Sequence, residues 1–323
     1  MNDTLSVLTS HFIGVIISSM FYGFALAQTW WYFRTYPKDR WSMKALVAFL
    51  WALDTAQLAL VAASIYHYAI VWQGDIAMSS HISKTFEASM GITSIIAFLV
   101  QLTYVYRIWR LSFGNTLVTF FIVLLALVAL GSGGGTLSFY SMSSYSNWSQ
   151  QWLSKREFSW SNTGLIDTGI SPSIHDPLWD STRVSNLPAS SFYLSLMACD
   201  FLIAATQVYL FHKSRNGRGR LGGLISRLTV LVVNVGLITT IDVTLFLILV
   251  RISTEEVIPL TISPFQFLVC PRNGAFLVPY TLMSHCYLNS FLSVLNSRLE
   301  LRELADNNEY ACPSIYTITS ELA

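Results

Sequence analysis

The sequence predicts an all-helical integral membrane protein, a bundle of seven transmembrane helices, and three observations lead to this prediction. Of the 323 residues, 53% are hydrophobic and only 11% are charged, whereas a soluble domain carries about 25% charged residues. The mean hydropathy of the chain is +0.50. The apolar residues also gather in seven runs, each close to the length of about 20 residues with which a helix crosses a bilayer.

The seven runs follow one another with short polar connections, except after the fourth. The first is too long for the apolar region of a cleaved signal peptide, so we expect it to remain as a membrane anchor. The fourth ends in glycines that we expect to fray the helix, and a long outer loop at 138–188 follows it. None of the runs alternates as the strands of a membrane barrel do. The predicted spans are 11–33, 45–72, 88–106, 116–137, 189–211, 228–250 and 275–295.

The Lys and Arg residues of the connections predict the orientation of the bundle. The amino-terminal tail at 1–10 has none, and the side opposite to it carries 13 of these residues against six on its own side. We therefore expect the amino terminus outside and the tail at 296–323 in the cytosol. Two acceptor sequons for glycosylation, at Asn2 and Asn147, both fall on the predicted outer side. The sequence leaves open whether the membrane is the plasma membrane or an internal one.

Several segments together resemble one known family. They include Tyr-Pro-Lys-Asp at 36–39 and Arg-Ile-Trp-Arg at 107–110, together with the stretches 28–33, 48–55, 95–101, 200–205 and 287–298. In this order they resemble the seven-helix membrane proteins of mushroom-forming (basidiomycete) fungi known as domain of unknown function 6534, over nearly all of residues 11–303. The resemblance implies the seven-helix fold and brings no assigned activity. The loop 138–188 and the segment 260–272 are longer than that pattern, as genuine loops or as translated introns.

Missing features argue against several classes of membrane protein and against an enzyme. The seventh run has no Lys for a retinal Schiff base, and no run carries the Arg ladder of a voltage sensor. The six histidines include no pair spaced by four residues, so we expect no metal site and no cofactor. The net charge of +1 gives no reason to expect nucleic-acid binding.

Three carboxylates lie inside the predicted spans: Asp54 near mid-membrane, Asp200 and Asp242. A carboxylate at the bilayer centre costs about 2.5–3.5 kcal/mol, so each should face the bundle and be neutral, hydrogen-bonded or holding a cation or water. The expected neighbours on the same helices are Gln57 for Asp54, Gln207 for Asp200 and Thr239 for Asp242.

The seventh run adds a polar stripe on one helix face, formed by His285, Asn289, Ser293 and Asn296. Two interpretations remain open for the stripe and for the carboxylates. They can line a polar site for a ligand or ion, or they can join helices through hydrogen bonds of about 0.6 kcal/mol each. A second stripe of small residues in the first run, Ser19, Gly23 and Ala27, is typical of helix packing.

Three functional classes stay open for this bundle. A receptor-like sensor is slightly favoured by the seven spans, the outside amino terminus and a basic fifth loop. A transporter or proton-coupled carrier would use the buried carboxylates, and a non-catalytic membrane organiser is the third class. Besides the bilayer itself, the partners would be a small ligand or a cytosolic protein. The basic loop, which would contact anionic lipid or such a partner, contains Lys213, Arg215, Arg218 and Arg220.

Overall fold

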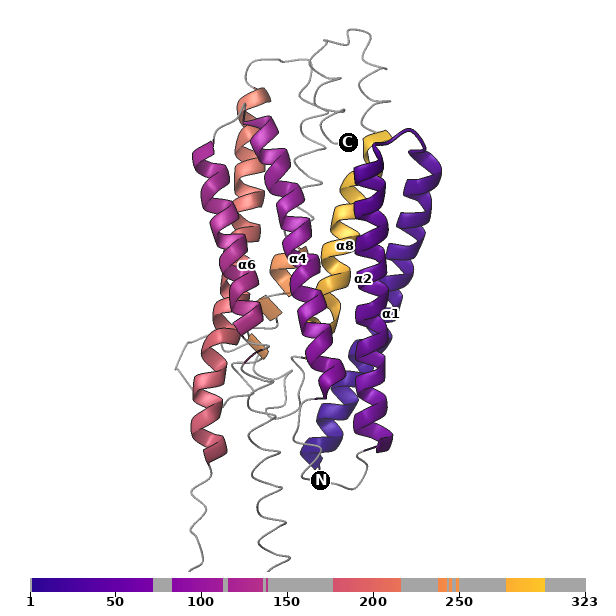
Figure 1. Ribbon diagram of the computed structural model, residues 1–323, viewed down its shortest axis with the longest axis vertical. Coiled ribbons are helices and arrows are strands. Elements are labelled where there is room, and N and C mark those ends of the chain that lie inside the picture. The colour runs from indigo at the N-terminus through magenta and orange to yellow at the C-terminus, as the bar shows by residue number, and fades with distance from the viewer. Residues whose placement is uncertain are drawn as a thin grey trace, which may run out of the picture.

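The described part of the molecule consists of long helices that run side by side along one axis (Figure 1). The computed structural model describes residues 2–71, 83–112, 116–135, 138, 177–215, 238–242, 244, 245, 248, 249 and 277–299, and no strand occurs among them. The helices are α1 (Asn2–Thr35), α2 (Trp41–Tyr66) with the π-helical turn η1 (His67–Val71), α4 (Lys84–Leu111), a helix at Thr116–Gly135, α6 (Pro177–Arg215) and α8 (Leu277–Asn296). The described residues of 238–249 are helical as well.

Five of the described helices are long and apolar enough to cross a membrane. They are Leu8–Thr35, Trp41–Val71, Lys84–Leu111, Thr116–Gly135 and Phe192–Lys213. These correspond to the first five predicted runs, so the all-helical membrane architecture is confirmed for this part of the chain. Helix α8 coincides with the seventh run and carries its polar stripe, and it is not one of these five helices. Of the sixth run, 228–250, only nine residues are described.

The helices extend beyond the apolar runs. Helix α1 begins at Asn2, so residues 2–10 of the expected tail are helical, and α6 begins at Pro177, within the expected loop 138–188. Helix α4 continues to Leu111 and carries Arg107 inside it, although a loop was expected there. With 28 residues α4 is about 42 Å long. That length matches a bilayer with its headgroups, whereas an apolar run measures only the hydrocarbon core.

Some predicted features lie outside the described residues. They are the sequon at Asn147, most of the loop 138–188, the segment 260–272, the tail from residue 300 on, and two of the four residues chosen in the basic loop, Arg218 and Arg220. Of the other two, Lys213 is exposed at the end of α6, and Arg215 is the last residue of that helix.

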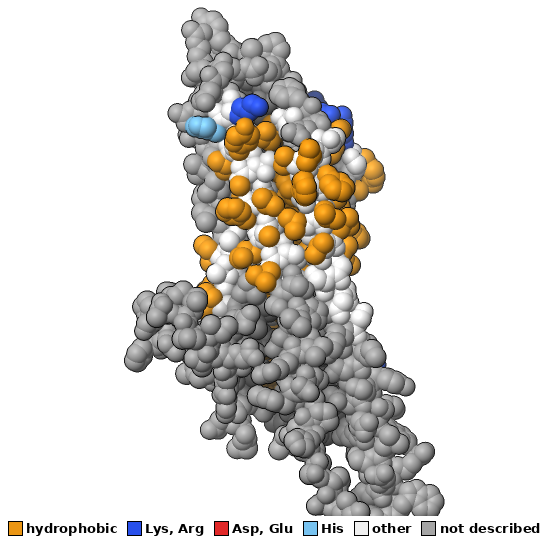
Figure 2. Space-filling model, turned by 90° about the vertical axis from the view of Figure 1, so that its left-hand side faces the viewer, with side chains coloured by type: hydrophobic (Ala, Val, Ile, Leu, Met, Phe, Trp, Pro, Cys, Tyr) orange, Lys and Arg blue, Asp and Glu red, His pale blue; other side chains and the backbone are white. Residues whose placement is uncertain are grey.

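The outer surface of the described bundle is apolar, as a lipid-facing surface must be. Phe24 of α1 is 64% exposed and Leu117 is 66% exposed, far beyond the scattered apolar residues of a soluble surface. Figure 2 shows hydrophobic side chains over the middle of one face, with Lys and Arg at its upper end. Exposed tryptophans gather where membrane proteins place them, near the headgroups: Trp30, Trp31, Trp41 and Trp109.

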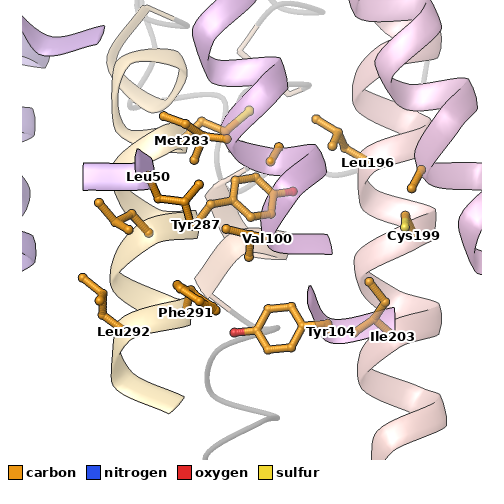
Figure 3. Packing of buried hydrophobic residues seen from close by; sticks show 14 of the residues in the cluster. Leu50, Val100, Tyr104, Leu196, Cys199, Ile203, Met283, Tyr287, Phe291 and Leu292 are labelled. Atoms are coloured by element: carbon orange, nitrogen blue, oxygen red, sulfur yellow. The ribbon is translucent and has the colours of Figure 1, made fainter. Parts of the chain in front are cut away.

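Helix α8 lies inside the bundle, packed against α1, α2 and α4 (Figure 1). Fifteen of its 20 residues are buried, which explains how it tolerates polar groups that a lipid-facing helix could not carry. Figure 3 shows Met283, Tyr287 and Phe291 of α8 facing Val100 and Tyr104 of α4. Beyond α4 the core continues to α6, through Leu196, Cys199 and Ile203.

Two glycines permit close approach between helices. A Cβ added at Gly14 would lie 2.7 Å from Thr281 Oγ1 of α8, and one at Gly133 would lie 2.8 Å from Ser94 Oγ of α4. By contrast, Gly23 has nothing within 4 Å of such a Cβ, and the whole stripe that it forms with Ser19 and Ala27 is exposed. The expectation that this stripe packs against another helix is therefore wrong for the described bundle.

Candidate functional site

The centre of the candidate site is a buried pair that joins α2 to α8. His285 Nδ1 lies 2.9 Å from Asp54 Oδ2 with hydrogen-bond geometry and 2.8 Å from Oδ1. Both side chains are 0% exposed. An isolated carboxylate is costly to bury in a membrane bundle, so the contact with the imidazole stabilises Asp54 at this depth.

Further polar atoms near this pair have no hydrogen-bond partner among the described residues. On the pair itself these atoms are His285 Nε2 and Asp54 Oδ1, the latter held only by the short contact to the imidazole. One helical turn along α2, Gln57 is 0% exposed and leaves both amide atoms unpaired, so it has not become the partner of Asp54 that its spacing predicted. Unpaired buried groups of this kind are costly and rare in folded proteins.

Other titratable side chains surround the pair. The ring of Tyr22 on α1 lies 6.3 Å from the His285 ring, centre to centre, and its hydroxyl is hydrogen-bonded to Thr55 Oγ1 on α2 at 3.0 Å. The thiol of Cys286 interacts electrostatically with Asp54 and with Asp242. The pair is therefore in contact with α1 as well as with the two helices that carry it.

A second buried carboxylate, Asp200, joins α6 to α4 and α8. Tyr287 donates a hydrogen bond to its Oδ2 at 2.6 Å, and Gln101 Nε2 donates one to Oδ1 at 2.9 Å. The side chain of Thr239, from the helical residues near 240, adds a third hydrogen bond. These partners differ from Gln207, the neighbour expected from the sequence. Asp200 thus forms one hydrogen-bonded junction of four helical segments.

Asp242 lies close to this junction but is less well satisfied. It is 7% exposed, its Oδ2 has no hydrogen-bond partner among the described residues, and it interacts electrostatically with Tyr287. Thr239, expected beside it, is hydrogen-bonded to Asp200 instead. Asp242 therefore lies between the other two carboxylates, since it interacts electrostatically with Tyr287, which binds Asp200, and with Cys286, which also interacts with Asp54.

The two asparagines of the polar stripe join α8 to α1. Asn289 Nδ2 donates to the carbonyl oxygen of Phe21 at 3.0 Å, and Asn296 Nδ2 donates to that of Gln28 at 3.0 Å. Both hydrogen bonds bring α8 against the backbone of α1. For the asparagines this geometry supports the interpretation as interhelical hydrogen bonds, while His285 alone in the stripe meets a carboxylate.

A cluster that the sequence analysis missed lies at the end of the bundle where α1 meets α2 and where α8 ends, called here the basic end because of its Lys and Arg residues. Arg298, 0% exposed, pairs through Nη2 with Asp39 Oδ2 at 2.6 Å, and Tyr32 donates to the same oxygen at 3.0 Å. The Tyr36 ring centre lies 4.3 Å from the guanidinium carbon. The Tyr36 hydroxyl bridges the end of α8, because it donates to the Asn296 carbonyl and accepts from the backbone N–H of residue 299.

The sequence identified the carboxylates that are costly to bury in a membrane, but not most of the side chains that bind them. Gln101 and Tyr287 bind the carboxylate of Asp200, and Asp39 binds the guanidinium of Arg298. In the sequence analysis these three residues appeared only as parts of the segments that resemble a family. Their presence in those segments was the available signal.

The comparisons with known proteins add a family without an activity. The model of a family described as "Family of unknown function (DUF6534)" matches residues 196–300. This stretch contains Asp200, Asp242, His285 and Arg298, whereas Asp54 and Asp39 precede it. No curated protein and no solved structure matches the chain. The match supports the family resemblance for this part of the chain.

Proposed function

We propose that the protein is a receptor-like, non-enzymatic sensor with seven transmembrane helices, in which α8 connects the buried core to the basic end of the bundle. One observation carries the proposal. Helix α8 is held in its middle by the His285–Asp54 pair, and the residues that follow its end are held by the Arg298–Asp39 pair; His285 and Arg298 are both fully buried. Asn296, the last residue of α8, lies 11 positions beyond His285, or about 16 Å along the helix.

The direction of α8 supports seven spans. Its contacts advance together with those of α1, since Asn289 meets Phe21 and Asn296 meets Gln28 seven residues further along both helices. The two helices are therefore parallel. Four described spans separate them, namely α2, α4, Thr116–Gly135 and α6, so α8 as a sixth crossing would run antiparallel to α1. A parallel α8 requires one more crossing, which we assign to the run 228–250.

The cytosolic side follows from the positive charges. The basic loops lie at the end where α1 meets α2 and where α8 ends, and we assign that end to the cytosol. A stimulus that alters the His285–Asp54 pair from the membrane core would then reach the cytosolic surface through α8. The contact between the two side chains can be made or broken, so it provides two states for such a helix to respond to.

The test measures whether the pair controls the distant end. Spin labels at Arg110 on α4 and Leu299 beyond α8, both exposed, would report the distance between the two helix ends in lipid nanodiscs, in a background without reactive cysteines. We expect Asp54→Asn to shift this distance by an amount on the order of the 1–2 Å helix movements of known switches, and to broaden its distribution. Ser293→Ala, a matched change on α8 away from the pair, should leave it unchanged.

An Asp54→Asn protein with the wild-type distance distribution would contradict the sensor and favour a role of the pair in packing, as in a membrane organiser. A carrier is the second candidate, favoured by Asp200 and by the unsatisfied Asp242 beside Tyr287. It predicts proton-driven solute flux in vesicles containing the purified protein, lost in Asp200→Asn. The sensor predicts no such flux.

A further inference from the structure

Two arginines at the basic end of the bundle face little negative charge from the part of the chain that the structure describes. Arg107 on α4 is 5% exposed and Arg298 beyond α8 is 0% exposed. Their guanidinium groups are close enough to interact electrostatically. Asp39 is the only carboxylate that the described residues offer to either of them, and it pairs with Arg298. Counted over the described residues, the cluster therefore holds two positive charges against one negative charge.

Three donors of this cluster have no acceptor among the described residues. They are Nη2 of Arg107, Nη1 of Arg298 and the hydroxyl of Tyr104. Within the described residues, Arg107 contacts the Tyr104 ring, whose centre lies 5.7 Å from the guanidinium carbon. An aromatic face contributes only about 0.5–2 kcal/mol to a cation, whereas burying an unpaired charge costs several kcal/mol. A negatively charged acceptor bound in this cluster would give such donors a partner.

The depth of the cluster in the membrane indicates which anion is available. Arg107 precedes the end of α4, Leu111, by four residues, or about 6 Å. Two residues after Arg107, Trp109 is 40% exposed, and Trp30, Trp31 and Trp41 are exposed on the segments that flank Asp39. Tryptophans of this kind mark the level of the headgroups, where lipid phosphates lie.

We propose that Arg107, Arg298 and Tyr104 form a binding site for a phosphate oxyanion at the cytosolic headgroup level, between the ends of α4 and α8. Guanidinium groups bind phosphate through two parallel N–H donors, which suits two arginines with a free donor each. The source of the phosphate is an anionic phospholipid of the inner leaflet or free phosphate. The cytosolic placement rests on the orientation proposed above, whereas anion binding at the site does not require the sensor function.

The test is a thermal-shift titration of the full-length protein in nanodiscs of phosphatidylcholine. Three probes are added at equal concentration: a short-chain phosphatidylinositol phosphate, inorganic phosphate and short-chain phosphatidylcholine. We expect the first to raise the melting temperature of the wild type and the third to leave it unchanged. A shift with inorganic phosphate as well would assign the site to free phosphate, and a shift with the lipid alone would assign it to the headgroup.

The variants separate a built site from general attraction to basic loops. Arg107→Gln should weaken the apparent affinity at least tenfold and should raise, or leave unchanged, the melting temperature without anion, because it removes an unpaired buried charge. Arg110→Gln, an exposed arginine one turn further on α4, should retain wild-type affinity. Tyr104→Phe serves as a second variant, and we expect it to weaken binding by a factor of a few.

Several results would overturn the proposal. One is the absence of any anion-dependent shift in the wild type, which also decides the matter if Arg107→Gln does not fold. Another is an equal loss of affinity in Arg107→Gln and Arg110→Gln, which would mean that surface charge accounts for the binding. A shift abolished by moderate salt in the wild type would have the same meaning, because exposed charges are screened more than buried ones.

Discussion

Replacing His285 by Phe should be one of the most destabilising single changes in the bundle. It leaves Asp54 buried without its partner, at a site where both side chains are 0% exposed. At 2.8 Å and an effective dielectric constant of about 20, the attraction within a charged pair is about 6 kcal/mol. Desolvation of both groups offsets much of this, so we expect the loss of one partner to cost about 3–5 kcal/mol.

The assay is a double-mutant cycle on the free energy of unfolding in detergent. It compares the wild type with Asp54→Leu, His285→Phe and the double variant. Replacing both partners by apolar residues removes the uncompensated group as well as the pair, so the double variant should be more stable than His285→Phe alone. As a control, Asp54→Leu combined with Ser293→Ala should be additive within about 0.5 kcal/mol. If the costs of Asp54→Leu and His285→Phe simply add up, the pair is not coupled and the reasoning fails.

Three further predictions concern packing, hydrogen bonding and topology. Gly14→Val should destabilise the bundle by about 1–3 kcal/mol through a clash with α8. Gly23→Val, whose Cβ has open space, should change the melting temperature by no more than about one or two degrees. Equal effects of the two changes would contradict the observed packing of α1. Tyr287→Phe removes the 2.6 Å hydrogen bond to the buried carboxylate of Asp200 and should lower the free energy of unfolding by about 1.5–3 kcal/mol. Replacing the exposed Tyr106 by Phe should change it very little. Identical melting curves for the two variants would show that the Tyr287 hydrogen bond contributes nothing. A tag at the carboxyl end should be protected from protease in unpermeabilised cells that carry the protein at their surface, and its cleavage there would reverse the proposed orientation.

The helices were predictable because the bilayer fixes the length of apolar runs, but their ends were not. Helix α4 illustrates the difference. Its apolar run ends at Tyr106, and the following Arg107 was counted among the loop charges. The helix continues to Leu111, since backbone hydrogen bonds and the headgroup region both permit it, and the Tyr104 ring covers the guanidinium. Hydropathy registers the charge of an arginine and does not register the aromatic ring one turn before it.

The members of the candidate site were predictable one at a time, and their pairing was not. Asp54 and His285 were identified because each is expensive in a membrane, but 231 positions separate them, and helical periodicity defines a face without defining which helix it meets. The neighbours chosen along the same helix, such as Gln57 for Asp54, were the only ones that spacing can supply. Contacts between helices supplied the actual partners.

The most direct test of the central claim is the distance between labels at Arg110 and Leu299 when the His285–Asp54 pair is removed from either side. If the contact is transmitted along α8, Asp54→Leu and His285→Phe should shift the distance in the same direction. The double variant should shift it no further than either single change, because each one already removes the same contact. A wild-type distance in either single variant, or shifts that add up in the double variant, would contradict the account.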